Sequence, residues 1–219
     1  MMTTTPHPFD AVRPEPVEGL KGSQGRLNPF PSRGEDVKEG KNLYTRLGEV
    51  LRFPREDIRP AVDECIEIII KGRYPEEAVN ELRNFRKDLE KMSLDALQEL
   101  YSYTFELVSD TTLDLGYYLY EGFKRGTKLQ TVKSMYREKG FPYDDVAKGE
   151  LPDNLPVTLQ FLGFLKDEEL RKDFTKTFVI QALEKLYRNF QTKKNAYRHL
   201  INAIYKILDK DIKEKEEVS

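Results

Sequence analysis

The chain has 219 residues, which is enough for one domain with a terminal extension. It carries 36 Lys and Arg against 38 Asp and Glu, so its formal net charge of −2 favours neither nucleic acid nor an anionic membrane as a partner. Two histidines and one cysteine, Cys65, exclude an internal disulfide and argue against a histidine-based metal or catalytic site. We therefore expect no bound metal or cofactor, no nucleic-acid partner and no membrane insertion.

Residues 1–42 differ in composition from the rest of the chain. They hold six of the 12 prolines and five of the 13 glycines but few large aliphatic residues, which predicts a disordered extension. The start of the chain has no apolar run of signal-peptide length, and the longest aliphatic run, Ile68–Ile70, is far too short to span a membrane, so we expect a cytoplasmic protein. The charged residues 210–219 predict a fraying tail, which leaves one domain over residues 43–209.

The first half of this domain has the apolar spacing of helices. Val62, Cys65, Ile66 and Ile69 form one stripe, which predicts a helix that ends near Gly72. A second helix is expected from Pro75 to Leu89, because proline and acidic residues suit a first helical turn. Ser93 is the expected N-cap of a third, which runs to Val108.

The second half continues the helical pattern. Asp110 or Thr111 is expected to cap a helix that runs through Tyr117 and Tyr120 and continues, bent near Gly122 and Gly126, to Gly140. A loop over 141–156, a short helix over 157–165, a long helix capped by Asp167 and a last helix over 197–208 follow. Because no segment alternates as a strand does, the sequence predicts an all-α, single-domain bundle of about seven or eight helices.

Catalytic motifs are absent from the sequence. It contains neither a GxxxxGK[ST] phosphate loop nor a GxGxxG turn. Cys65 lies on an apolar helix face, which favours a buried structural thiol, and His199 is expected to be a surface or capping histidine. We find no combination of nucleophile, base and orienting group, so the sequence indicates a protein that is not an enzyme.

Two segments resemble a known family. One spans residues 105–126 and contains Thr111, Tyr117, Tyr118 and Gly122, followed by Arg125-Gly126; the other contains Glu150-Leu151-Pro152-Asp153-Asn154-Leu155-Pro156. The chain is similar here, from about Leu43 to Leu208, to the NarJ family of nitrate reductase molybdenum cofactor assembly chaperones, and more distantly to the TorD- and DmsD-type chaperones of related molybdoenzymes. Asn154 stands where that family usually carries histidine, so a mechanism that needs a titrating imidazole there does not transfer.

The resemblance implies an all-α chaperone. Such proteins bind the N-terminal or twin-arginine-like segment of a molybdoenzyme catalytic subunit and keep the enzyme competent for insertion of the molybdenum cofactor. An amphipathic peptide in a groove would need apolar walls and acidic partners for its arginines. The candidate walls are Tyr117, Tyr120, Leu159 and Leu162, and the candidate peptide-binding loop and acids are Asp144, Asp145, Glu150, Leu151, Pro152, Asp153 and Asn154.

Three other interpretations remain open at this point. Residue chemistry alone favours a simple helix-entry loop, in which prolines stiffen residues 150–156 and Asp153 or Asn154 caps the following helix. A helical adaptor unrelated to molybdoenzymes would use the same bundle. A carboxylate-based metal enzyme would need Glu-x-x-His spacing, which neither histidine has.

We predict that residues 1–42 are dispensable for folding, because their composition cannot bury enough apolar surface to offset the entropy of ordering them. A truncated chain that starts at Lys41 should keep its helicity and its melting temperature, as measured by circular dichroism. A loss of several degrees on truncation would instead show that this segment packs on the domain.

Overall fold

The computed structural model describes residues 42–213, and this part of the chain is helical throughout. It contains no β-strand, and its only bridge of that kind is an isolated antiparallel pair between Asp114 and Asn154. The predicted all-α class is confirmed. The predicted extension over residues 1–42 lies outside the described residues except for Asn42, and so do residues 214–219 of the predicted tail.

The helices follow one another with short connections. The α-helices are α1 (Leu43–Val50), α2 (Arg59–Lys71), α3 (Glu76–Leu89), α4 (Leu94–Tyr101), α5 (Gly116–Leu119), α6 (Gly122–Glu138), α7 (Tyr143–Ala147), α8 (Leu155–Phe164), α9 (Glu168–Phe174), α10 (Ile180–Phe190) and α11 (Tyr197–Lys213). Two π-helical segments, η1 (Ser102–Leu107) and η3 (Thr175–Val179), continue α4 and join α9 to α10, and a 3-10 turn, η2 (Ser109–Thr111), follows η1.

Two helices begin at side-chain caps that the sequence predicts, Ser93 and Asp167. The hydroxyl of Ser93 accepts a hydrogen bond from the Ala96 amide at 3.2 Å, and the Asp167 carboxylate accepts one from the Leu170 amide at 3.0 Å. These bonds satisfy amides that have no partner within the first turn of a helix. Both predicted caps are therefore confirmed.

The helix expected from Asp110 through Tyr120 is wrong, whereas the interruption expected near Gly122 is present. Residues 109–111 form the η2 turn, α5 has only four residues, and Tyr120 and Glu121 are extended before α6 begins. Gly122 has a φ of +50°, a left-handed conformation that glycine adopts at little cost and that breaks the helix. This break, a helix over 43–50 and the short α7 inside the expected loop raise the number of helices above the predicted seven or eight.

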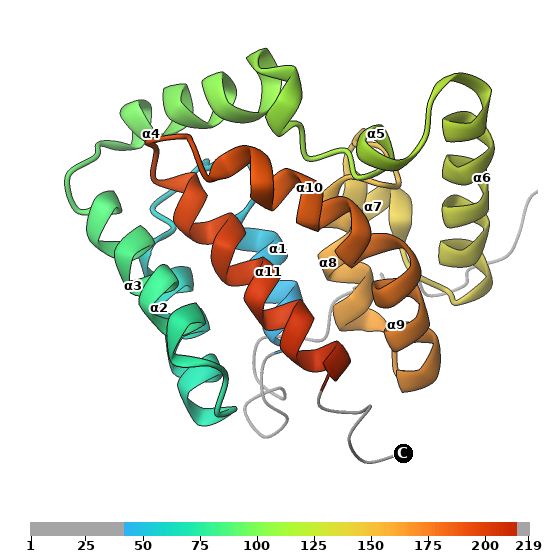
Figure 1. Cartoon of the computed structure of the whole chain (residues 1–219), viewed down its shortest axis with the longest axis horizontal. Helices are drawn as coiled ribbons and strands as arrows, with labels where there is room; N and C mark the ends of the chain where they lie inside the picture. Colours follow the sequence, from blue (N-terminus) through green and yellow to red (C-terminus); the bar gives the residue numbers. More distant parts are fainter. Residues whose placement is uncertain (1–41, 214–219) are drawn as a thin grey trace, which may run out of the picture.

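Figure 1 shows α10 and α11 crossing one face of the bundle, with α2 and α3 at one side and α6 standing at the opposite edge. The helix α11 packs against α3 and α10, and α1 packs against α8 and α2. Aromatic rings fill the space between α3, α4 and α11: the ring of Tyr197 lies 5.6 Å from Phe85, 5.7 Å from Tyr101 and 4.9 Å from Phe105 between centroids. The last helix runs to Lys213 with Ile212 buried, beyond the predicted domain boundary at residue 209.

A polar contact also joins α3 and α11. His199 lies half-buried with its Nδ1 2.6 Å from Glu81, and the other oxygen of Glu81 accepts a hydrogen bond from Asn202 at 2.9 Å. His199 therefore bridges two helices, whereas the sequence suggested a surface or capping residue. Between Asn42 and Lys213, none of the helices has the length and apolar content that a membrane crossing requires.

The contact between α1 and α8 depends on a close backbone approach at Gly48. A Cβ added to Gly48 would lie 2.8 Å from the carbonyl oxygen of Pro156 and 3.0 Å from Cγ of Gln160. Backbone atoms cannot swing aside as the end of a flexible side chain can. The lack of a side chain at Gly48 therefore allows α8, the helix that follows the candidate loop, to pack closely against α1.

Replacing Gly48 by Ala should lower the unfolding free energy by about 1–3 kcal/mol, because the added methyl group overpacks the α1–α8 contact. The matched control is Gly126→Ala in α6, where an added Cβ would meet nothing within 4 Å. That variant should gain up to about 1 kcal/mol from helix propensity. Urea unfolding measures both, and a Gly48→Ala protein as stable as wild type would contradict the close packing.

Candidate functional site

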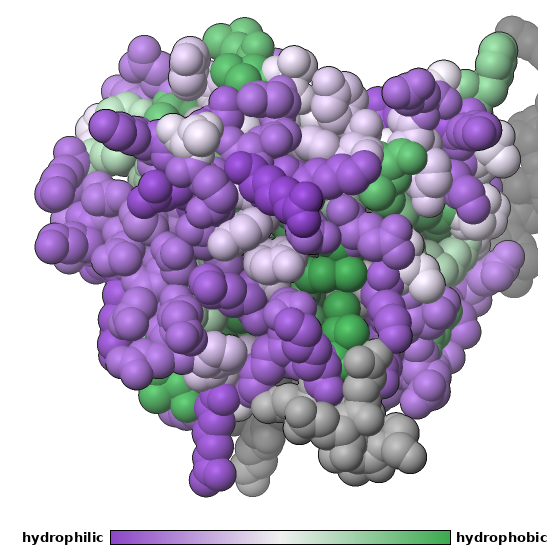
Figure 2. Space-filling view, in the orientation of Figure 1, coloured by the Kyte–Doolittle hydropathy of each residue, from purple (hydrophilic) through white to green (hydrophobic). Residues whose placement is uncertain are grey.

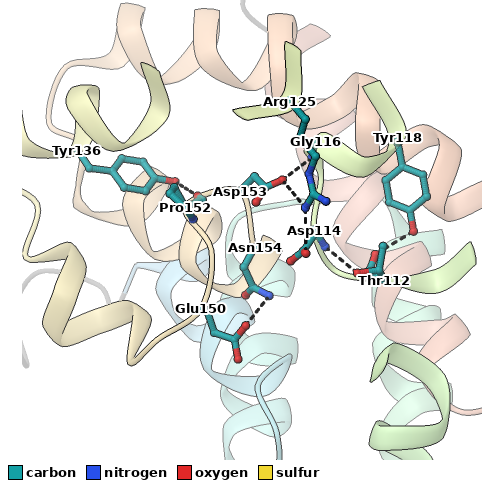
Figure 3. Close-up of polar contacts among 10 residues, drawn as sticks. All are labelled: Thr112, Asp114, Gly116, Tyr118, Arg125, Tyr136, Glu150, Pro152, Asp153 and Asn154. Carbon is teal, nitrogen blue, oxygen red and sulfur yellow. Dashed lines mark hydrogen bonds and ion pairs between the residues drawn. The ribbon is translucent and has the colours of Figure 1, made fainter. Parts of the chain in front are cut away.

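The Glu150–Pro156 loop and the segment before α5 form one joint. The Leu115 amide donates to the Asp153 carbonyl at 2.9 Å, and the Leu155 amide donates to the Leu113 carbonyl at 2.8 Å. These two bonds make the antiparallel bridge between Asp114 and Asn154, and Figure 3 shows the side chains gathered around it. The two segments that carry the family resemblance therefore lie side by side, although about 40 residues separate them in sequence.

Asp153 is the centre of this joint. Its side chain is fully buried, and its Oδ2 accepts a hydrogen bond from the Gly116 amide at 2.8 Å, at the first residue of α5. A Cβ on residue 116 would lie 2.6 Å from that oxygen, so only glycine allows this approach. Asp153 thus binds the N-terminus of α5 and not that of the following helix α8.

Arg125 of α6 connects this joint to a third element of the fold. The Arg125 Nη2 lies 3.4 Å from Asp153 Oδ2 and 3.0 Å from Asp114 Oδ2, so one guanidinium bridges two carboxylates (Figure 3). Burial raises the pKa of Asp153, and the nearby Asp114 charge raises it further, against the opposing effects of the Gly116 amide and Arg125. The second oxygen, Oδ1, accepts no hydrogen bond within residues 42–213, which is consistent with a carboxylate that is costly to ionise.

Two tyrosine hydroxyls fix the backbone of the loop. The buried Tyr136 of α6 donates to the Pro152 carbonyl at 2.8 Å, and Tyr143 at the start of α7 donates to the Glu150 carbonyl at 2.7 Å. The ring of Tyr136 also packs on Phe161 of α8, with centroids 4.4 Å apart. The loop is therefore held from α5, α6 and α7 together, as a rigid loop needs.

Asn154 occupies the N-cap position of α8 but makes no side-chain cap bond. Its side chain is almost buried, and its Nδ2 lies 3.5 Å from Glu150 Oε2. The expectation that Asp153 or Asn154 caps α8 is wrong for both residues. Asn154 instead links the two ends of the loop by a long hydrogen bond.

The structure separates the predicted peptide-binding residues into two groups. Tyr117, Leu151, Glu150, Asp144 and Asp145 are exposed, with Tyr117 at 48% and Leu151 at 40%. Tyr120 is half-buried and stacks on Phe178 with centroids 6.4 Å apart, so it faces η3 and does not share a free face with Tyr117. Asp144 and Asp145 lie in the first turn of α7, where the positive end of the helix dipole stabilises carboxylates.

The residues of the second group are buried, so the prediction that they line an exposed binding surface is wrong. Leu159 and Leu162 are fully buried in the core, so they are not walls of an exposed groove, and Pro152 is buried as well. Asp153 already has a guanidinium partner in Arg125 of its own chain and is closed off from solvent. Leu159 and Leu162 thus belong to the core, and Pro152 and Asp153 are buried residues of the loop itself.

Sequence reasoning missed the residues that hold Asp153. Asp114, Gly116 and Arg125 belong to the pattern that carries the resemblance, but Asp114 and Gly116 were expected inside a helix and Arg125 in its bent continuation. The useful signal was Asp114-Leu115-Gly116, because an acidic residue and a glycine two positions apart inside an expected helix favour a break. Among the described side chains, no three His, Cys, Asp or Glu residues lie together as a metal site requires.

Replacing Asp153 by Asn should change how stability depends on pH. The raised pKa means that the folded state takes up this proton at a higher pH than the unfolded chain, whose Asp pKa is about 3.9. Wild type should therefore gain stability relative to Asp153→Asn as the pH falls through the raised pKa, with the full gain below about pH 3.9. Urea unfolding of both proteins from about pH 7.5 to about pH 3.5 measures this difference.

The control for this experiment is Asp145→Asn, an exposed substitution that should change the unfolding free energy by less than about 0.5 kcal/mol. If acidification leaves the gap between wild type and Asp153→Asn unchanged, or favours the variant, Asp153 is not the desolvated group that the geometry indicates.

Comparison with known proteins identifies the family of this chain. The family model described as "Nitrate reductase delta subunit" matches residues 74–196, more than half of the chain, and this range includes the whole joint. The chain is also 27% identical over 169 residues to the "Probable nitrate reductase molybdenum cofactor assembly chaperone NarJ" of Bacillus subtilis (strain 168), which covers 76% of this chain and 88% of that protein. The chain belongs to the nitrate reductase delta subunit family.

Proposed function

We propose that this member of the family is a non-catalytic assembly chaperone. It binds the N-terminal segment of the catalytic subunit of a nitrate reductase or a close molybdoenzyme relative and keeps that subunit competent for insertion of the molybdenum cofactor. The observation that carries the proposal is the coincidence of the two motif segments in one rigid joint, in a chain whose similarity to a NarJ protein extends over 169 residues.

The surface of the joint suits a peptide with arginines. We call the exposed residues Tyr117, Glu150 and Leu151 the rim; they supply an aromatic ring, a carboxylate and an aliphatic side chain. Beneath them, Asp153, Arg125 and Tyr136 fix the backbone from which the rim projects. Because the rim is fixed before a peptide arrives, binding does not have to order the loop, which favours affinity.

The charge of the rim is also suited to a cationic segment. Partial burial raises the pKa of Glu150, and the nearby charges of Asp114 and Glu106 raise it further. A guanidinium from a bound peptide would relieve this repulsion between carboxylates. The exposed acids Asp144 and Asp145 remain further candidate partners on α7.

The test is made in the source organism under nitrate-respiring conditions. Deletion of the gene should leave the nitrate reductase catalytic subunit with little molybdenum and little activity, and the wild-type gene should restore both. The affinity-tagged chain should co-purify the catalytic subunit, but not a catalytic subunit from which the N-terminal segment has been removed.

A substitution in the rim gives the sharper form of the experiment. Leu151→Ser combined with Glu150→Gln should weaken binding of the N-terminal peptide by about 1–3 kcal/mol in calorimetry and should leave the melting temperature unchanged, because both side chains are exposed. A deletion strain with fully active, molybdenum-loaded nitrate reductase would overturn the chaperone proposal and favour the unrelated adaptor.

A further inference from the structure

One continuous stretch of the chain carries no positive charge. Residues 92–123 contain no Lys, Arg or His, although the whole chain has 36 Lys and Arg, and they contain six acidic residues: Asp95, Glu99, Glu106, Asp110, Asp114 and Glu121. This stretch includes α4, η1, η2 and α5. The formal net charge of −2 therefore conceals an acidic stretch of the sequence, in which Asp110 and Asp114 pair with Lys193 and Arg125 from other parts of the chain.

The helix formed by α4 and η1 is apolar on two sides. Its inner side packs Leu97, Tyr101 and Phe105 against the core, as an ordinary bundle helix does. A second apolar row lies at helical spacing beside it: Leu100 is half-buried, Tyr103 is 61% exposed and Leu107 is 77% exposed. Figure 2 shows hydrophobic side chains at the upper edge of the molecule, where this helix runs in Figure 1.

Acidic side chains border the exposed apolar row. Asp95, Glu99 and Glu106 are all exposed, and Glu99 and Glu106 directly precede Leu100 and Leu107 of that row in the sequence. None of the three takes part in an ion pair within residues 42–213. An apolar row with a free acidic border is the complement of an amphipathic helix whose apolar side is bordered by Arg or Lys.

This helix and the rim share residues 52–54 as a neighbour. Gln98 of α4 donates a hydrogen bond to the Pro54 carbonyl at 2.8 Å, and Arg52 contacts α7 next to the loop. Burial raises the pKa of Tyr101, and the charges of Glu150 and Glu106 raise it further; burial, Asp114 and Glu106 raise the pKa of Glu150. The cation that faces these acids is Arg52, which donates to the Val146 carbonyl at 2.6 Å and counteracts both shifts. Glu106 and Glu150 therefore share one cation, Arg52. Two carboxylates beside one guanidinium give their surroundings a net negative charge.

We propose that the outer face of α4 and η1, formed by Leu100, Tyr103 and Leu107 with Asp95, Glu99 and Glu106, docks a basic amphipathic helix, which is the N-terminal segment of the client's catalytic subunit. This inference rests on the proposed function and assigns its peptide to a surface larger than the rim. Tyr103 and Leu107 are the apolar anchors, and the acids select the basic sequence and speed its encounter. Both anchors lie in η1, Tyr103 near its start and Leu107 at its end.

The experiment measures binding of a synthetic peptide that covers the N-terminal segment of the nitrate reductase catalytic subunit from the same genome. Tyr103→Ser with Leu107→Ser should weaken binding by about tenfold or more, because exposed apolar anchors contribute to the complex and little to the fold. Glu99→Gln with Glu106→Gln should weaken binding several-fold at low salt and should flatten its dependence on salt. All variants should melt at the wild-type temperature.

Matched controls lie elsewhere on the surface. Ile70→Ser removes an exposed aliphatic side chain from α2, and Glu56→Gln with Glu138→Gln removes two exposed acids outside this face. Neither control should change the affinity. A photo-crosslinking amino acid at position 107 should capture the peptide, whereas the same group at position 70 should not.

The outcomes separate this inference from the proposed function. A peptide that binds wild type but is unaffected by both sets of substitutions, and that does not crosslink to position 107, overturns the docking face and leaves the chaperone function standing. A peptide with its Arg and Lys residues replaced by Gln that binds as tightly as the original also overturns it. A wild-type protein that binds no peptide, in a strain whose nitrate reductase assembles without it, overturns both.

Discussion

A buried carboxylate connects the elements that form the candidate site. Asp153 binds the first amide of α5 and the guanidinium of Arg125, and its own backbone carbonyl pairs with Leu115, so one residue joins the loop, α5 and α6. A charge in such a place is expensive unless hydrogen bonds and an opposite charge compensate it. The arrangement limits what its neighbours can be: residue 116 must be glycine, and position 125 must carry a cation that reaches both Asp153 and Asp114.

Much of the fold follows from local sequence, because local sequence determines helix starts. Ser93 and Asp167 cap helices where they were expected, and the helical apolar rows identify the core positions of α2 and α3. The break before α5 does not follow in the same way. There Asp114 pairs with Asn154, a contact between residues 40 positions apart that the helical spacing of apolar residues does not show.

The same limit applies to the candidate site. The motif Glu-Leu-Pro-Asp-Asn-Leu-Pro singled out a loop, but its residue chemistry could not distinguish a carboxylate that is open to solvent from one that faces its own chain. Asp153 and Glu150 are both acids in one loop, yet the first is closed off by Arg125 and the second is exposed. Similarly, Leu159 and Leu162 lie on a helix that is apolar on almost every side, so its period did not show that both faces are covered.

The position of α6 links the charge of Asp153 to a local unfolding event. Only Val132 and Tyr136 of this 17-residue helix are buried, and both lie in its C-terminal half. Its first turns are held to the body of the protein by Arg125, between a left-handed Gly122 and the exposed Gly126. When those turns fray, Asp153 loses its cation and takes up a proton more readily, so opening of the helix and protonation of the carboxylate favour each other. The backbone amides at the start of α6 are thus thermodynamically coupled to a carboxyl group in a loop about 30 residues away. Protonation of that group lowers their protection against exchange with solvent, measured relative to the intrinsic exchange rate at the same pH.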